Sequence, residues 1–107
     1  MISFGDKKNY DDFKKQLSPI VIVLFDSLRN FCFSLGKNVI EDIRMHRIVF
    51  CKSISFRWFV DIEPLEESIK LRIQKDRKVP QETIVITNDN GVEFVKEQIR
   101  NAYNTIH

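Results

Sequence analysis

The sequence predicts a two-layer α+β domain, in which an antiparallel sheet of four or five strands carries an N-terminal and a C-terminal helix on one face. Alternating apolar and polar residues between Ile54 and Gln74 indicate strands with one buried face. Amphipathic helical patterns lie before and after this stretch. The composition, 43% hydrophobic and 30% charged over 107 residues, fits one core, so we expect residues 1–107 to form a single domain.

The chain begins with a polar lead-in and two helices. We expect residues 1–8 to be poorly ordered and residues 9–17 to form a short helix, with acidic residues at its start and lysines after them. Ser18 is a good N-cap, and Pro19 fits the first helical position, where its missing N–H costs nothing. Gly36 is expected to supply the left-handed residue that ends many helices. Apolar residues recur between them at three- and four-residue steps: Ile20, Leu24, Phe25, Leu28, Phe31, Cys32 and Leu35.

The region from Val39 to Lys52 is expected to hold one or two strands. Neither alternating set of residues in it is cleanly apolar, which predicts a turn or bulge near His46 and Arg47. Ser53 marks the next turn, which leads into the central hairpin.

In the central hairpin, Pro64 interrupts the alternation because it has no N–H for a ladder. With Glu63 opposite Ser68, Asp61 would meet Lys70 and Phe59 would meet Arg72, both on the outer face, and both are favourable neighbours. One apolar row is predicted to face the helices, with Trp58 buried at its centre: Ile54, Phe56, Trp58, Val60, Ile62, Ile69, Leu71 and Ile73.

The remaining segments are a charged loop, a strand and a helix. The loop covers residues 75–80, and residues 82–87 read as a strand that residues 88–91 stop. Asn90, with Glu93 three residues later, resembles a capping box. The helix that follows has an apolar stripe: Val92, Val95, Ile99, Ala102, Tyr103 and Ile106.

Several functional classes find no support in the sequence. His46 and His107 lie in no metal-ligand spacing, and the Glu-x-Lys triplet that follows the acids of a two-metal nuclease is absent near the hairpin, so we expect neither enzyme activity nor a cofactor. Cys32 and Cys51 are expected to be reduced core thiols. Asp61 and Glu63 are expected to be solvated and paired with lysine.

The cellular location is predicted from two features that the sequence does not show. Neither a signal peptide nor an apolar run long enough for a membrane span is visible, which predicts a cytoplasmic protein.

The outer face of the predicted sheet suggests weak binding of single-stranded nucleic acid. Cations would hold phosphates there, and an exposed aromatic ring would stack on a base. The net charge of +2 is too small to imply this alone, and a half-buried sheet shows water some polar face in any case. The candidate residues are Arg57, Phe59, Lys70, Arg72, Lys75, Arg77 and Lys78, with Gln74 beside them. Arg44, His46, Arg47 and Lys52 could extend the set from the preceding strands.

A protein-interaction or homodimerisation module is the alternative. Phe33, Phe59 and Phe94 lie off the predicted apolar rows, and exposed aromatic residues are enriched at interfaces. A free sheet edge would offer a second docking surface. Salt sensitivity separates the two hypotheses, because an aromatic interface survives ionic strength that strips phosphate contacts.

Between Leu24 and Tyr103 the chain resembles a small bacterial and archaeal α+β domain of unknown function. Some members of that family are joined to nuclease-like proteins. The resemblance rests on four short motifs: Leu24-Phe25 with Ser34-Leu35-Gly36, residues 47–52, residues 59–64 and residues 99–103. A more distant resemblance is to MmcQ/YjbR-type proteins, for which DNA binding has been suggested. Neither resemblance supplies catalytic residues.

Overall fold

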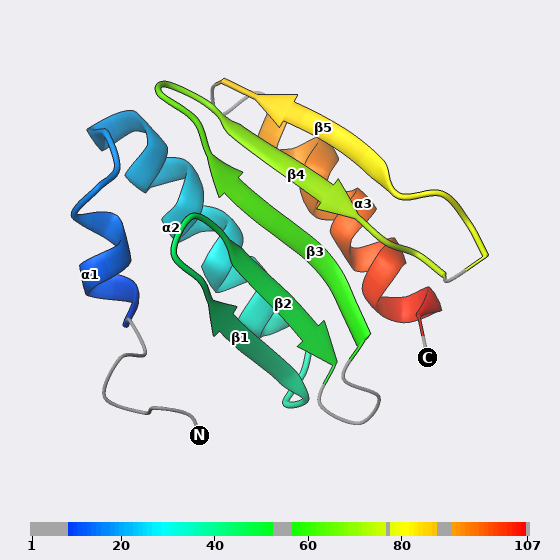
Figure 1. Cartoon of the computed structure of the whole chain (residues 1–107). Coiled ribbons are helices and arrows are strands. Elements are labelled where there is room, and N and C mark those ends of the chain that lie inside the picture. The colour runs from blue at the N-terminus through cyan, green and yellow to red at the C-terminus, as the bar shows by residue number, and fades with distance from the viewer. Residues whose placement is uncertain (1–8, 53–56, 77, 88–90, 107) are drawn as a thin grey trace.

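A computed structural model describes residues 9–52, 57–76, 78–87 and 91–106 (Figure 1). The predictions for residues 1–8, for Ser53, Ile54 and Phe56, and for the Asn90 cap lie outside the described residues. The helices are α1 (Tyr10–Lys14), α2 (Pro19–Ser34) and α3 (Val92–Thr105). The strands are β1 (Val39–Ile43), β2 (Ile48–Lys52), β3 (Arg57–Pro64), β4 (Ile69–Ile73) and β5 (Glu82–Ile86).

The five strands form one antiparallel sheet in the order β1-β2-β3-β4-β5, so each strand pairs with its neighbour in sequence. Helices α2 and α3 lie against one face of this sheet (Figure 1). The predicted two-layer α+β architecture is confirmed. The predicted turn near His46 is confirmed as well, because the Arg44 N–H donates to the Arg47 carbonyl between β1 and β2.

The helix starts follow the capping rules only in part. The Asn9 side chain accepts a hydrogen bond from the Asp12 N–H and so caps α1, and Pro19 is the first residue of α2. Ser18 stands at the predicted N-cap position of α2, but its side chain makes no capping bond there, because its hydroxyl donates to the Glu66 carbonyl at 3.0 Å.

The buried face of α2 is centred on Leu24 and Leu28, and it takes in Val21 rather than the predicted Ile20. Gly36 follows the helix end, but its φ lies outside the left-handed region, so the predicted left-handed helix end is wrong.

Arg29 ties α1, α2 and β1 together. Its guanidinium group forms a two-point contact with the Glu41 carboxylate and lies 4.1 Å from the centre of the Tyr10 ring. The Tyr10 hydroxyl in turn donates to Asp26 at 2.7 Å. The short helix α1 is therefore held to the domain by polar contacts as well as by the buried ring of Phe13.

The register of the central hairpin differs from the prediction by two residues. Pro64 pairs with Ile69, and the Leu65 N–H donates to the Ser68 carbonyl to close the turn. Pro64 therefore ends β3 instead of interrupting the alternation. Asp61 consequently lies opposite Arg72, and not opposite Lys70 as predicted.

A β-bulge on β3 reverses the face of Trp58. Cys51 pairs with Trp58 while Phe50 pairs with Val60, which leaves Phe59 as an extra residue between them. Phe59 and Val60 are both fully buried. The prediction that Trp58 lies beneath the helices is therefore wrong.

The bulge buries Phe59 where the prediction buried Trp58. The Phe59 ring packs edge-on against Tyr103 of α3 with ring centres 5.3 Å apart, and its carbonyl accepts a hydrogen bond from the Gln74 N–H. The bulge therefore brings the ring of its extra residue, Phe59, into contact with the Tyr103 ring in the core. The larger indole of Trp58, which carries a polar N–H, stays at the surface.

Candidate functional site

The outer face of the sheet is the one opposite α2 and α3. Directly paired residues of neighbouring strands share a face, so the pairing identifies its members. Asp61 pairs with Val49 on one side and with Arg72 on the other. The same rule adds the remaining positions: Ile40, Asp42, Cys51, Trp58, Glu63, Lys70, Thr83 and Val85.

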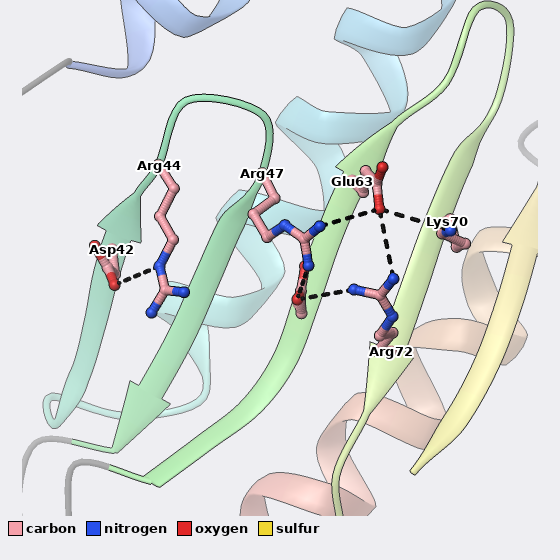
Figure 2. Close-up of polar contacts among 7 residues, drawn as sticks. Asp42, Arg44, Arg47, Glu63, Lys70 and Arg72 are labelled. Atoms are coloured by element: carbon pink, nitrogen blue, oxygen red, sulfur yellow. Dashed lines mark hydrogen bonds and ion pairs between the residues drawn. The ribbon is translucent and has the colours of Figure 1, made fainter.

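Two carboxylates bind three cations at the centre of this face (Figure 2). Asp61 Oδ2 accepts hydrogen bonds from the Nη1 atoms of Arg47, at 3.0 Å, and Arg72, at 3.4 Å. Glu63 Oε1 lies 3.6–3.8 Å from the side-chain nitrogens of Arg47, Lys70 and Arg72. We call these five residues the central charge cluster.

The acids of the central charge cluster lie deeper than its cations. The side chains of Asp61 and Glu63 are 12% and 24% exposed, whereas those of Arg47, Lys70 and Arg72 are 28–32% exposed. Three cations against two carboxylates leave one formal positive charge. The carboxylates hold the guanidinium groups in place, and the cations form more of the surface that solvent reaches.

A shallow depression of about 350 Å³ lies beside the central charge cluster. Trp58 supplies its aromatic wall and Val49 an apolar surface. Asp61 also lines this depression, and its Oδ1 atom is buried and accepts no hydrogen bond from the described residues. The residues around the depression are Arg44, Val49, Trp58, Asp61, Arg72 and Gln81.

The structure brings two of the predicted site residues together and removes a third. Lys70 and Arg72 lie side by side on the outer face and share the contact with Glu63. Phe59 does not lie there: its side chain is fully buried against α3. Its predicted outward position is wrong because the bulge turns it inward. Among the residues that the structure describes in the strands, Trp58 is the aromatic one on the outer face.

The other predicted site residues lie toward one end of the sheet. Lys75 turns toward the helices, where its Nζ contacts Glu82 at 3.4 Å and Gln98 of α3 at 3.2 Å. Lys78 is exposed in the loop after β4. Arg57, at the start of β3, is half-buried and pairs with Lys52, so it shares the helix-side face of Lys52 and its predicted place on the outer face is wrong. Arg77 lies outside the described residues.

Residues of the preceding strands divide between the two faces. Arg44 pairs with Asp42 at 3.0 Å and contributes to the depression, and Arg47 belongs to the central charge cluster. His46 is exposed in the turn between β1 and β2. Lys52 is on the helix side, where its Nζ donates to the Ile106 carbonyl at 2.7 Å, so its expected place on the outer face is wrong.

Sequence reasoning missed the roles of Trp58 and Asp61. Asp61 was expected to be solvated, yet the residue is only 8% exposed and binds two arginines. A signal was present: Asp61 and Glu63 alternate along a strand, and Lys70 and Arg72 do so along the next one. Matching two acids to two cations would have given the observed register, with Glu63 opposite Lys70.

The aromatic residues put forward for protein contact differ in their surroundings. The Phe33 ring contacts Phe50 edge-on at 5.7 Å and lies beneath the Arg29 guanidinium group. Phe94 on α3 is 60% exposed. Phe94 is thus the aromatic residue of this set with most of its side chain in solvent.

Both cysteines are free thiols. Cys32 is fully buried in α2, and its burial raises the pKa of its thiol far above the ordinary value. Cys51 lies on the outer face next to Trp58, and partial burial raises the pKa of its thiol as well. A raised pKa lowers the fraction of thiolate, so both side chains are poor nucleophiles near neutral pH.

The described residues include neither a metal-binding cluster nor a helix that could cross a membrane. Among these residues, His, Cys, Asp and Glu side chains form no group of three that could hold a metal ion. The described helices are too short or too polar to cross a bilayer.

Comparison with protein-family models, curated proteins and solved structures finds no match to this chain. The resemblances drawn from the short motifs between Leu24 and Tyr103 therefore stay predictions.

Proposed function

We propose that the outer face of the sheet binds single-stranded nucleic acid weakly and with little sequence preference. The observation that carries this proposal is the position of Trp58. The chain's only tryptophan stands on the face opposite α2 and α3, at a depression that Arg44 and Arg72 also line. A base stacks on such a ring, and the neighbouring guanidinium groups contact the adjoining phosphates.

The central charge cluster determines how strongly we expect the outer face to bind nucleic acid. Asp61 and Glu63 already compensate part of the charge of Arg47, Lys70 and Arg72, so the long-range attraction for a polyanion is modest. The same acids hold the two guanidinium groups in fixed positions, which lowers the entropy lost on binding. We therefore expect weak binding that is strongly weakened by salt.

The fluorescence of Trp58 provides a direct test. Titration with homopolymeric single-stranded DNA and RNA at low salt should quench its emission, because a stacked base contacts the indole ring. Raising the salt should reverse the quenching, with a slope of about −0.7 in log K against log salt for each phosphate contacted. Unchanged fluorescence at low salt, with no binding of a labelled oligonucleotide, would remove the proposal.

A pair of matched arginine variants tests whether nucleic acid binds at the outer face of the sheet. Arg44 and Arg100 are both exposed and both pair with a nearby acid, Asp42 and Glu97, but Arg100 lies on α3 and not on the outer face. Arg44→Ala should weaken binding and make the salt slope shallower, whereas Arg100→Ala should change neither. Equal effects of both variants would mean that the binding is a general response to positive charge.

The stacking contribution is measured with Trp58→Ala and a labelled oligonucleotide. Loss of one base–aromatic contact costs about 1–3 kcal/mol, or roughly a factor of 5 to 150 in affinity. Affinity unchanged by Trp58→Ala would contradict the role given to this residue.

A further inference from the structure

The two edges of the sheet differ in how they are protected against pairing with another strand. At one edge, β1 contains Glu41 and Asp42, and Arg29 binds Glu41 from the helix side. Charged residues that point inward on an edge strand are a common protection against strand addition. The β1 edge is therefore guarded.

The β5 edge has that protection only at its first residue, and the rest of the strand is uncharged. From Thr83 to Thr87 the sequence is Thr-Ile-Val-Ile-Thr, uncharged and wholly β-branched, without proline. The one charged residue of β5 is Glu82 at the start of the strand, which pairs with Ile73 and so faces the helix side as Glu41 does, and contacts Lys75 at 3.4 Å. Val85 is 53% exposed and Ile84 is half-buried. Such an edge is a ready template for another strand.

Phe94 lies on the same side of the molecule. Lys96 and Arg100 of α3 lie over the Phe31 ring, so they mark the side of α3 that faces α2. Phe94 is two positions before Lys96, about 160° around the helix, and therefore points away from α2. Gln98, one turn after Phe94, contacts Lys75 beyond the end of β4, which places this side of α3 near β5.

We propose that the β5 edge, together with Phe94, is the interface of a symmetric homodimer in which two β5 strands pair antiparallel. A twofold axis at Ile84 sets Thr83 opposite Val85 and Glu82 opposite Ile86. An axis at Val85 sets Thr83 opposite Thr87. Neither register brings like charges together, so this strand is complementary to itself.

The guarded β1 edge explains why a second copy of β5 is the partner. Pairing of β5 with β1 of another molecule would be heterologous and would extend into a ring or a filament. It would also place the uncharged strand against Glu41 and Asp42. Pairing of β5 with β5 uses up both unguarded edges and leaves the guarded β1 edges outside.

The mass of the full chain in solution tests the proposal. Sedimentation equilibrium up to millimolar concentration should show the mass rising from 12.7 kDa toward twice that value. High salt should leave the dimer intact, because the stretch from Thr83 to Thr87 that forms the interface is uncharged. A monomer mass at every concentration would overturn the proposal and would leave the nucleic-acid proposal untouched.

Two matched lysine variants locate the interface. Val85 and Ile40 are exposed residues on the outer faces of opposite edge strands. Val85→Lys should weaken the dimer by about tenfold or more, since the two introduced charges approach each other across the axis. Ile40→Lys should leave it unchanged. Dissociation by Ile40→Lys, or a dimer indifferent to Val85→Lys, would refute the assignment.

Hydrogen exchange on the unmodified chain provides a second measurement that needs no variant. The backbone N–H groups of β5 that point away from β4 should become more protected as the protein concentration rises. Those of the β1 edge should keep the same exchange rate. Protection that grows on β1 and not on β5 would overturn the proposal.

Discussion

Replacing the two neighbouring aromatic residues on β3 tests the bulge. Phe59→Ala should destabilise the domain by about 3–5 kcal/mol, because a fully buried ring is removed and a cavity is left beneath α3. Trp58→Ala should lower the stability by less, about 1–2 kcal/mol, since Trp58 lines the open depression on the outer face, where water fills the space left and no cavity forms. A regular alternation without the bulge predicts the reverse order.

The contact between Phe59 and Tyr103 adds a term that can be measured separately. Edge-to-face ring pairs contribute about 0.5–1.5 kcal/mol beyond the area that they bury. A double-mutant cycle with Phe59→Leu and Tyr103→Leu should therefore give a coupling energy of that size. A parallel cycle with Trp58→Leu and Tyr103→Leu should give a value near zero, because Trp58 is on the opposite face.

Urea unfolding followed by far-UV circular dichroism is the suitable assay, since Trp58→Ala removes the only tryptophan probe. The midpoints should fall in the order wild type, Trp58→Ala, Phe59→Ala, with similar m-values. A stability of about 5–15 kcal/mol is typical of natural domains, so Phe59→Ala could leave a large unfolded fraction. Equal costs for the two variants, or a larger cost for Trp58→Ala, would refute the bulge.

Three further predictions concern thiols, a tyrosine and a glycine. In the native protein, Cys51 should react with a thiol reagent faster than Cys32, because Cys32 is fully buried and should react only at the rate of unfolding. Equal rates would contradict this difference in burial between the two thiols. Burial and a hydrogen bond to a carboxylate raise the pKa of Tyr10, so the stability that this phenol contributes should be lost as the pH rises above about 10, and Tyr10→Phe should lose less over that range in pH-dependent unfolding. A Cβ on Gly36 would collide with the Tyr103 hydroxyl, so Gly36→Ala should cost about 1–3 kcal/mol in wild type and less in a Tyr103→Phe background, as urea midpoints would show.

The fold class and most elements could be predicted because each depends on local patterns. Ser18 and Pro19 mark the start of α2, and the apolar stripe from Val92 to Ile106 predicts the buried face of α3. The turn at His46 was visible as a break in the alternation. These features need no information about distant residues.

The candidate site could not be predicted in the same way. Inserting one residue at Phe59 reverses every earlier position of the strand, and nothing in the local sequence favours Phe59 over Trp58 as the buried ring. The choice depends on Tyr103, which lies more than forty positions later and offers the ring contact. The outward face therefore carries Trp58 only because of a partner that the local pattern does not reveal.

The order of the strands has a consequence for synthesis on the ribosome. All five strands precede α3 in the chain, yet α3 covers Phe59 and packs on β3 and β4. A nascent chain can pair its neighbouring strands early, but the part of their apolar face that α3 covers stays open to water until this last helix emerges. During that interval the uncharged β5 edge and the uncovered core are exposed together, which makes this the stage at which a chaperone would protect the chain most.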